Sequence, residues 1–298
     1  MVTAILLTFF ILNSFIMRAD ELLPLGNFAL PTALQPSPLF SFGQNIVDAH
    51  DQLGYISPFY YKGKKDKFYF FNDWYFLYGL SDSTSVFVLI NVPVIHHENN
   101  LKKSGFGDTI IQGEYAFINK QTAYSSRQAT LVASVYLPSG VMEPSRLGPG
   151  LAPHNPFTGT GSPSFFFGTT ANYTNFDWYV FGSCGGLITT THKESKVGNS
   201  IYYQAGVGHN LKYYNDKILL LLFEFDGTRT QKNKLMGIIN PNSGGTTIYF
   251  GPSLYYATKH FIFQIGAQAP IYQRLNGIQP TISYLFSISF TWVFHHET

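Results

Sequence analysis

Carboxylate and amide side chains recur on alternate positions of apolar stretches, and they are the groups in this sequence best suited to chemistry. In GDTIIQGEYAF (107–117) they share one parity while the other parity is largely apolar, and KILLLLFEFDG (217–227) and HFIFQIGAQAP (260–270) repeat the arrangement. The full set is Asp108, Gln112, Glu114, Gln204, Glu224, Asp226, Gln264 and Gln268. These groups could line a polar path for a solute, or they could fill an interior and cross-link it by hydrogen bonds.

Other reactive groups lack the spacing that catalysis or metal binding requires. IHHENN (95–100) and FHHET (294–298) hold adjacent histidines, but strand neighbours point to opposite faces and rarely chelate one ion. No Gly-x-Ser-x-Gly occurs, and GSCGG (182–186) lacks the lysine of a phosphate loop. Cys184 is the single cysteine, so no intrachain disulfide can form. We therefore expect no metal site, no cofactor and no enzyme activity.

The stretch TISYLFSISFTWVF (281–294) shows what kind of element positions such side chains. One parity is wholly apolar and mostly aromatic, and the other is mostly small and polar. Period-two alternation indicates a strand, and this one is much longer than the usual five or six residues or so. In a soluble sandwich the aromatic face would lie in a core, whereas in an outer-membrane barrel it would face lipid. In the barrel, Tyr284, Trp292 and Phe294 are expected in the aromatic girdles.

Composition favours the barrel. Charged residues are 12% of the 298 residues and aromatic residues 17%, whereas about 25% of residues are charged in ordinary soluble proteins. The mean hydropathy is only +0.02, and no stretch after residue 20 holds 18 consecutive apolar residues, which argues against helical spans. The near balance of basic and acidic residues gives no reason to expect nucleic acid as a partner.

Alternating segments separated by turn residues predict an all-β, transmembrane antiparallel β-barrel of about twelve strands. The segments are 53–62, 67–80, 84–94, 106–118, 128–137, 163–173, 177–190, 199–209, 217–227, 246–256, 260–271 and 280–294. Connectors 95–105, 138–162 and 228–245 are long, whereas most of those that alternate with them are short. This alternation is typical of external loops and periplasmic turns, and it places the barrel in the bacterial outer membrane.

The chain divides into four parts. The apolar run AILLTFFILNSFIM (4–17) predicts a signal peptide, residues 1–19, cut near Ala19; the alternative is an uncleaved anchor. Residues 20–52 are rich in proline and show no strand period, so they form either an N-terminal periplasmic arm or a plug inside the barrel, and we favour the arm. The barrel occupies 53–294, and 295–298 form a C-terminal tail.

Six stretches resemble the family called "MetA-pathway of phenol degradation", a family of outer-membrane barrels. They are YGLSDSTSVFV (78–88), GFGDTIIQGEYAF (105–117), YLPSG (136–140), GTGSPSFFFG (159–168), GPSLYYA (251–257) and QIGAQAPIYQRLNG (264–277). Ser81 and Ser139 replace the threonines of the family pattern. The resemblance implies a channel for small, often hydrophobic or aromatic, compounds.

The sequence therefore predicts an outer-membrane barrel that acts as a passive channel or transporter for a small, possibly hydrophobic or aromatic, solute. Its expected partners are outer-membrane lipid, the solute and the barrel-assembly machinery, for which SISFTWVF (287–294) would be the signal. A structural or surface-interaction barrel that acts through its long loops is the alternative. A membrane-embedded hydrolase, with a Ser–His pair assembled from distant strands, is a third reading.

Overall fold

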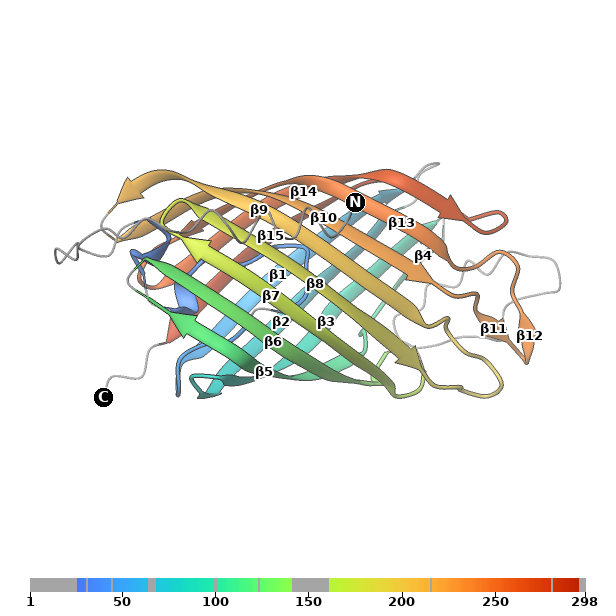
Figure 1. Ribbon diagram of the computed structural model, residues 1–298. Coiled ribbons are helices and arrows are strands. Elements are labelled where there is room, and N and C mark those ends of the chain that lie inside the picture. Colours follow the sequence, from blue (N-terminus) through green and yellow to red (C-terminus); the bar gives the residue numbers. More distant parts are fainter. Residues whose placement is uncertain are drawn as a thin grey trace, which may run out of the picture.

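Long antiparallel strands close into a ring in a computed structural model of the chain (Figure 1), which describes residues 26–294 except 31, 44, 64–67, 99–100, 123, 141–160, 215 and 280. The strands are β1 (Gln52–Gly63), β2 (Phe68–Ser81), β3 (Thr84–Glu98), β4 (Leu101–Gly105), β5 (Thr109–Gln121), β6 (Ser125–Leu137), β7 (Ser164–Asn175), β8 (Trp178–Thr189), β9 (Ser200–Tyr214), β10 (Lys217–Thr230), β13 (Gly245–Ala257), β14 (Phe261–Leu275) and β15 (Ile282–Phe294). Consecutive strands pair, and β1 pairs with both β2 and β15.

The ring confirms the predicted closed antiparallel barrel of 12 strands. Strands β4 and β5 occupy one position in it, because β4 pairs with the second half of β3 and β5 with the first half. Pairing of β15 with β1 removes the two open edges that an unclosed sheet would expose and that promote aggregation. Among the described residues, no helix is long and apolar enough to cross a membrane.

The two ends of the barrel differ in their connectors. Turns such as 82–83, 176–177 and 258–260 join strands at one end, which we call the short-turn end. Connectors such as 190–199 and 231–244 lie at the opposite, loop end, where β11 (Lys234–Leu235) and β12 (Ile238–Ile239) form a small hairpin, at the right of Figure 1. Among the described residues, the long connector predicted at 228–245 is therefore present, whereas most of the predicted loop 138–162 lies outside them.

The prediction of a long loop over 95–105 is wrong. Strand β3 continues to Glu98 and pairs with β4 from Val94 onward, so most of this range is a strand hairpin. The adjacent histidines concealed the strand, because their polarity breaks the apolar alternation used to find it.

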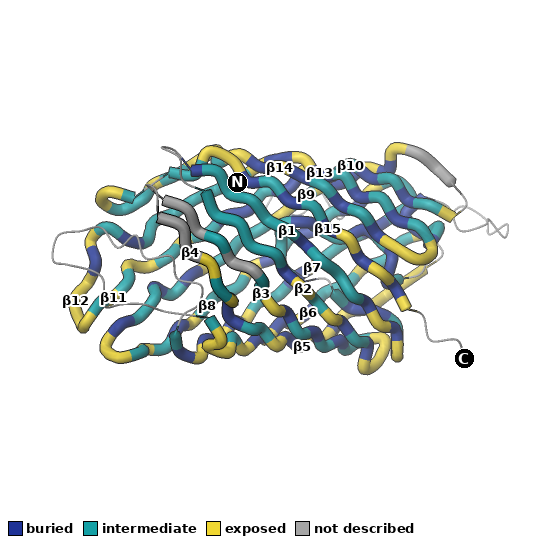
Figure 2. Tube along the Cα trace, turned by 180° about the vertical axis from the view of Figure 1, so that it is seen from behind, coloured by how far each residue is buried: buried dark blue, intermediate teal, exposed yellow. Residues whose placement is uncertain are grey.

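The two faces of each strand differ in exposure as the alternation predicts. In β15, Ser287, Ser289 and Thr291 are buried, whereas Phe290 and Trp292 are exposed. Strand β9 likewise exposes Ile201 and Val207 on the outside. Figure 2 shows this alternation of buried and exposed positions along many of the strands. The barrel wall is thus apolar toward its surroundings and more polar toward its interior.

The interior at the short-turn end is apolar, which the predicted polar interior did not include. On β10, Ile218, Leu220 and Leu222 face inward and are fully buried. Leu53 of β1 and Val293 of β15 belong to the same apolar cluster. An open aqueous lumen would leave these side chains in water, and they are buried because another part of the chain covers them.

Residues 26–51, which we call the inner segment, cover this apolar interior. The segment contains two short 3₁₀ helices, η1 (Gly26–Phe28) and η2 (Thr32–Leu34), and Leu30 and Leu34 join the apolar cluster. Its first described residues meet the β7–β8 turn, where the Asn27 N–H donates to the Phe176 carbonyl at 3.0 Å. Because the segment then passes inside the barrel, residues 26–51 match the alternative of a plug rather than the favoured periplasmic arm.

The inner segment returns to the short-turn end before β1 begins. The His50 N–H donates to the Gly79 carbonyl at 2.9 Å, and the Gly79 N–H donates to the Asp51 carbonyl at 3.0 Å. A β-carbon at Gly79 would overlap the carbonyl oxygen of Asp48, so only glycine permits this approach. The segment is therefore a loop that enters and leaves the barrel at the same end.

Two of the sequence motifs meet at a corner near the loop end. The Ser139 hydroxyl donates to the Gly107 carbonyl at 2.9 Å and accepts from the Thr109 N–H at 2.8 Å. Asp108 accepts from the Gly140 N–H at 3.0 Å. These bonds fix the start of β5 against the residues that follow β6.

Replacing Ser139 by alanine is expected to destabilise the barrel by about 1–2 kcal/mol, because the Thr109 N–H and the Gly107 carbonyl both lose a partner. Ser139→Thr keeps the hydroxyl and is expected to cost much less. Urea-dependent refolding into lipid vesicles measures both free energies. Equal losses for the two variants would show that the hydroxyl does not stabilise the corner.

Candidate functional site

Inward-facing polar side chains of the barrel wall, which we call the polar belt, hold the inner segment. They are Gln112, Glu114, Gln204, Glu224, Asp226, Gln264 and Gln268. Glu224 of β10 lies at the centre of this belt. Its carboxylate accepts from the Leu39 N–H at 3.1 Å and from the Phe40 N–H at 3.0 Å. The Ser253 hydroxyl of β13 donates to the same carboxylate at 2.5 Å. Glu224 is fully buried, and these three hydrogen-bond partners are all donors. This pattern fits a carboxylate, which is an acceptor only.

Glu114 of β5 holds the inner segment from the opposite part of the wall. It accepts from the Asn45 N–H at 3.0 Å and from the Asn45 side-chain amide at 2.6 Å. Gln112 donates to Glu114 at 2.7 Å and accepts from the Ser134 hydroxyl at 2.6 Å. The segment is therefore anchored on both sides of the barrel cross-section.

The remaining belt residues bind the stretch between these anchors. Gln204 accepts from the Phe42 N–H at 3.0 Å, and Asp226 accepts from the Ser41 hydroxyl at 2.9 Å. Gln264 donates to the Ser37 carbonyl at 2.9 Å. Gln268 donates to Asp226 at 2.5 Å. Seven of the eight polar residues singled out from the sequence thus form one network around the inner segment.

Asp108 lies elsewhere. It is buried at the corner formed by the ends of β4 and β6 and accepts from the Gly140 N–H. Its parity matches that of Gln112 and Glu114, but three residues between β4 and β5 displace it from the belt. Parity alone gives a facing direction and no height along the barrel.

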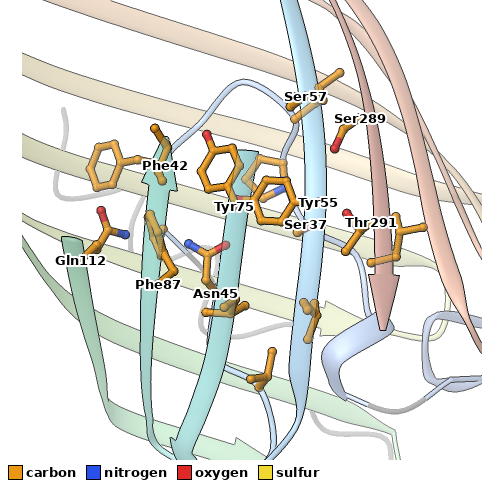
Figure 3. A pocket seen from close by; sticks show the side chains of 18 of the residues that line it. Ser37, Phe42, Asn45, Tyr55, Ser57, Tyr75, Phe87, Gln112, Ser289 and Thr291 are labelled. Carbon is orange, nitrogen blue, oxygen red and sulfur yellow. The ribbon is translucent and has the colours of Figure 1, made fainter. Parts of the chain in front are cut away.

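A cavity of about 260 Å³ lies between the inner segment and the wall. Figure 3 shows Ser37, Phe42 and Asn45 of the segment among the side chains that line it. The wall side comes from β1, β2, β3, β5, β6, β14 and β15. The lining combines aromatic rings, such as those of Tyr55 and Tyr75, with small hydroxyls.

The aromatic part of the wall is tightly stacked. The rings of Tyr55 and Tyr75 lie 3.8 Å apart with an angle of 13° between their planes. Phe59 stacks on Phe71 with centroids 4.9 Å apart. Stacked rings lose few further degrees of freedom on binding, so this wall is a preformed apolar surface for a small molecule.

Sequence reasoning missed these inward rings and several other contacts of the segment. Strands β1 and β2 carry aromatic residues on both faces, so alternation could not show which face was internal. The Tyr255 hydroxyl donates to the Leu34 and Gln35 carbonyls at 2.8 and 3.0 Å, and the Val47 N–H donates to Ser85 at 3.1 Å. Aromatic residues on both faces of a strand are the signal that could have revealed an occupied interior.

The other groups singled out from the sequence do not join this site. Tyr284, Trp292 and Phe294 are exposed on the outside of β15. Cys184 is exposed as well. The histidine side chains of IHHENN, and residues 295–298 of FHHET, lie outside the described part of the chain. Within the described part, no three metal-binding side chains gather.

No family model matches the chain, and no curated protein has a matching sequence. Among solved structures, the COG4313 outer membrane channel from Pseudomonas putida F1 has a TM-score of 0.64 and 11% identity, covering 85% of this chain and 100% of that one. A Pseudomonas aeruginosa FadL homologue has a TM-score of 0.38 at 9% identity, with coverages of 89% and 95%. The toluene transporter TbuX from Ralstonia pickettii has 0.34 at 12%, with coverages of 83% and 90%. Of these three similarities, the one to the COG4313 channel shows a shared barrel fold.

Proposed function

We propose that the protein is a bacterial outer-membrane barrel that binds a small hydrophobic or aromatic solute and passes it passively across the membrane. The barrel shares its fold with an outer membrane channel, and its outer face carries many exposed apolar side chains. The cavity between the inner segment and the stacked aromatic wall is the observation that supports a solute site most directly.

The cavity has the size and chemistry of a site for one substituted ring. Apolar protein cavities of about 150 Å³ admit benzene, and this cavity measures about 260 Å³. Tyr55, Tyr75 and Phe59 offer ring contacts, while Ser289 and Thr291 offer hydroxyls along the other edge. A small aromatic compound with one polar substituent would satisfy both parts of this lining.

Passage requires the inner segment to move. The segment hydrogen-bonds to belt residues on β5, β9, β10 and β14. It therefore crosses the barrel interior between the short-turn end and the loop end. Its anchors are hydrogen bonds to side chains rather than a continuous strand ladder. The anchors can therefore break one by one while the barrel stays closed.

Benzyl alcohol is expected to bind the purified protein at one site, whereas glucose is expected not to bind. Ser289→Trp fills the cavity from β15 and should weaken benzyl alcohol binding at least about tenfold, since the ring and the new indole compete for one volume. Ile288→Trp is the matched control, because Ile288 neighbours Ser289 and points to the opposite face. Calorimetric titration in lipid nanodiscs measures both.

Two results would contradict the solute site. One is unchanged benzyl alcohol affinity in Ser289→Trp when heat-modified gel mobility shows a folded barrel. The other is an equal loss in Ile288→Trp, which would mean that the ring partitions into the lipid-facing surface. Permeation itself is expected to rise when the anchor at Glu224 is removed.

A surface-interaction barrel is the second candidate, because the described connectors at the loop end form one braced unit. The Gly198 N–H donates to Asn233 at 2.8 Å, and the Asn276 N–H donates to the Gly244 carbonyl at 3.2 Å. The β11–β12 hairpin at its tip exposes Met236, Ile238 and Ile239. Deleting the hairpin is expected to leave benzyl alcohol binding unchanged under the channel proposal, and a loss of cell adhesion instead would favour the alternative.

Three further assignments belong to this proposal. The resemblance to the phenol-degradation family rests on the six sequence motifs, two of which meet at the Ser139 corner. We propose no catalytic role. The barrel-assembly machinery is expected to recognise the apolar end of β15, residues 287–294.

A further inference from the structure

A row of outward-facing residues crosses four neighbouring strands near the loop end. Arg229 of β10 pairs with Ile201 of β9 and with Thr246 of β13, and Thr246 pairs with Arg274 of β14. Arg229, Arg274 and Ile201 are exposed. Strands lie about 4.8 Å apart, so the two arginines start roughly 10 Å from each other on either side of Thr246.

An aromatic row lies directly below the arginines on the same outer face. Gly227, two residues before Arg229, pairs with Tyr203 and Ile248, and Ile248 pairs with Tyr272. The Tyr203 ring occupies the space outside Gly227. Tyrosines at this position mark the level where the apolar band meets the polar headgroups. The arginine row is therefore placed at headgroup level.

Within the described part of the chain, neither arginine has a carboxylate as counter-ion. No carboxylate of the described residues forms an ion pair or a side-chain hydrogen bond with Arg229 or Arg274. The charge around the two arginines is also positive. Six basic residues and one acidic residue lie in the described parts of connectors 190–199 and 231–244 and in the loop-end parts of β10 and β14. They are Lys193, Lys196, Arg229, Lys232, Lys234 and Arg274, with Glu194 as the acidic residue.

We propose that Arg229 and Arg274, with the Thr246 hydroxyl between them, bind a phosphate group of a lipid in the outer leaflet. Two guanidinium groups on either side of a hydroxyl offer several donors to one phosphate, which is the geometry that arginine favours. The lipid chains would then lie over Tyr203, Ile248 and Tyr272. This inference rests on the membrane-spanning barrel proposed above and is independent of the solute cavity.

Bisphosphorylated lipid A is the probe, and native mass spectrometry of the full chain in detergent is the measurement. We expect one lipid to remain bound to the wild type. Arg229→Gln with Arg274→Gln should weaken this binding about 30-fold, since each cationic side chain near an anionic lipid surface contributes roughly a factor of five. Inorganic phosphate at the same concentration is expected not to displace the lipid.

Lys120→Gln with Lys259→Gln is the matched control, because both lysines are exposed beside turns of the short-turn end. The control should change lipid binding less than twofold. Equal binding in the arginine variant and the wild type, or retention of a dephosphorylated lipid as strongly as lipid A, would overturn the proposal. Benzyl alcohol binding in the arginine variant should be unchanged, so failure of this site and failure of the solute site can be told apart.

Discussion

Replacing Glu224 by alanine is expected to raise the equilibrium population of a displaced inner segment by about 100-fold. The substitution leaves the Leu39 and Phe40 N–H groups without their acceptor, and hydrogen bonds to a charged group contribute about 1.5–3 kcal/mol each. A loss of about 3 kcal/mol corresponds to roughly two orders of magnitude in an equilibrium constant. Permeation of a solute should rise with the same variant.

A cysteine at Ser37, in a Cys184→Ser background, reports the displacement. Ser37 faces the cavity and contributes only its backbone carbonyl to the belt, so its substitution leaves the anchors intact. Maleimide labelling of this cysteine should accelerate in Glu224→Ala. Asp73→Ala is the matched control, because Asp73 is also buried in the interior but accepts from Tyr75 rather than from the segment. Equal acceleration in the control would mean general loosening of the barrel and would contradict the anchoring role.

Arginine at Val207 is expected to destabilise the folded protein by about 2–4 kcal/mol, whereas arginine at Ile201 should cost about 0–1 kcal/mol. Both residues are exposed on the outside of β9. Val207 lies near the middle of the strand and pairs with Phe223 and Val180, while Ile201 lies beside Arg229 at the loop end. Hydrocarbon cannot solvate a guanidinium at mid-depth, but headgroups and water can solvate it at the strand end.

Refolding titrations into lipid vesicles measure the two free energies. In a protein surrounded by water, both exposed positions would tolerate arginine within about 0.5 kcal/mol. Equal and small costs would therefore contradict a membrane-spanning barrel.

Strand number, direction and facing could be predicted from the sequence because each depends on local alternation. The twelve expected segments all correspond to barrel strands, and β15 alternates along almost its whole length. The inward direction of Glu114, Gln204 and Glu224 follows from the same rule. What these side chains do inside the barrel does not follow, because their partners are distant in sequence.

The inner segment shows why alternation is insufficient. Glu224 and Leu39 are separated by 185 residues, and no spacing within either stretch records their contact. The apolar part of the interior was hidden for a different reason. Residues 218–223 of KILLLLFEFDG are apolar at both parities. The sequence therefore does not show that Leu220 and Leu222 pack inside the barrel, whereas Leu221 faces outward.

The entry and return of the inner segment at one end has a consequence for the order of assembly. Residues 26–51 are synthesised before any strand, yet their partners include β13 and β14, which are among the last. The ring closes only when β15 pairs with β1, the strand that directly follows the segment. The barrel wall is thus expected to close around the inner segment, which is covalently joined to β1. Contacts between the segment and the last strands, and the pairing of β15 with β1, each close a long loop of chain. We therefore expect this loop closure, rather than the formation of hairpins between neighbouring strands, to limit the folding rate.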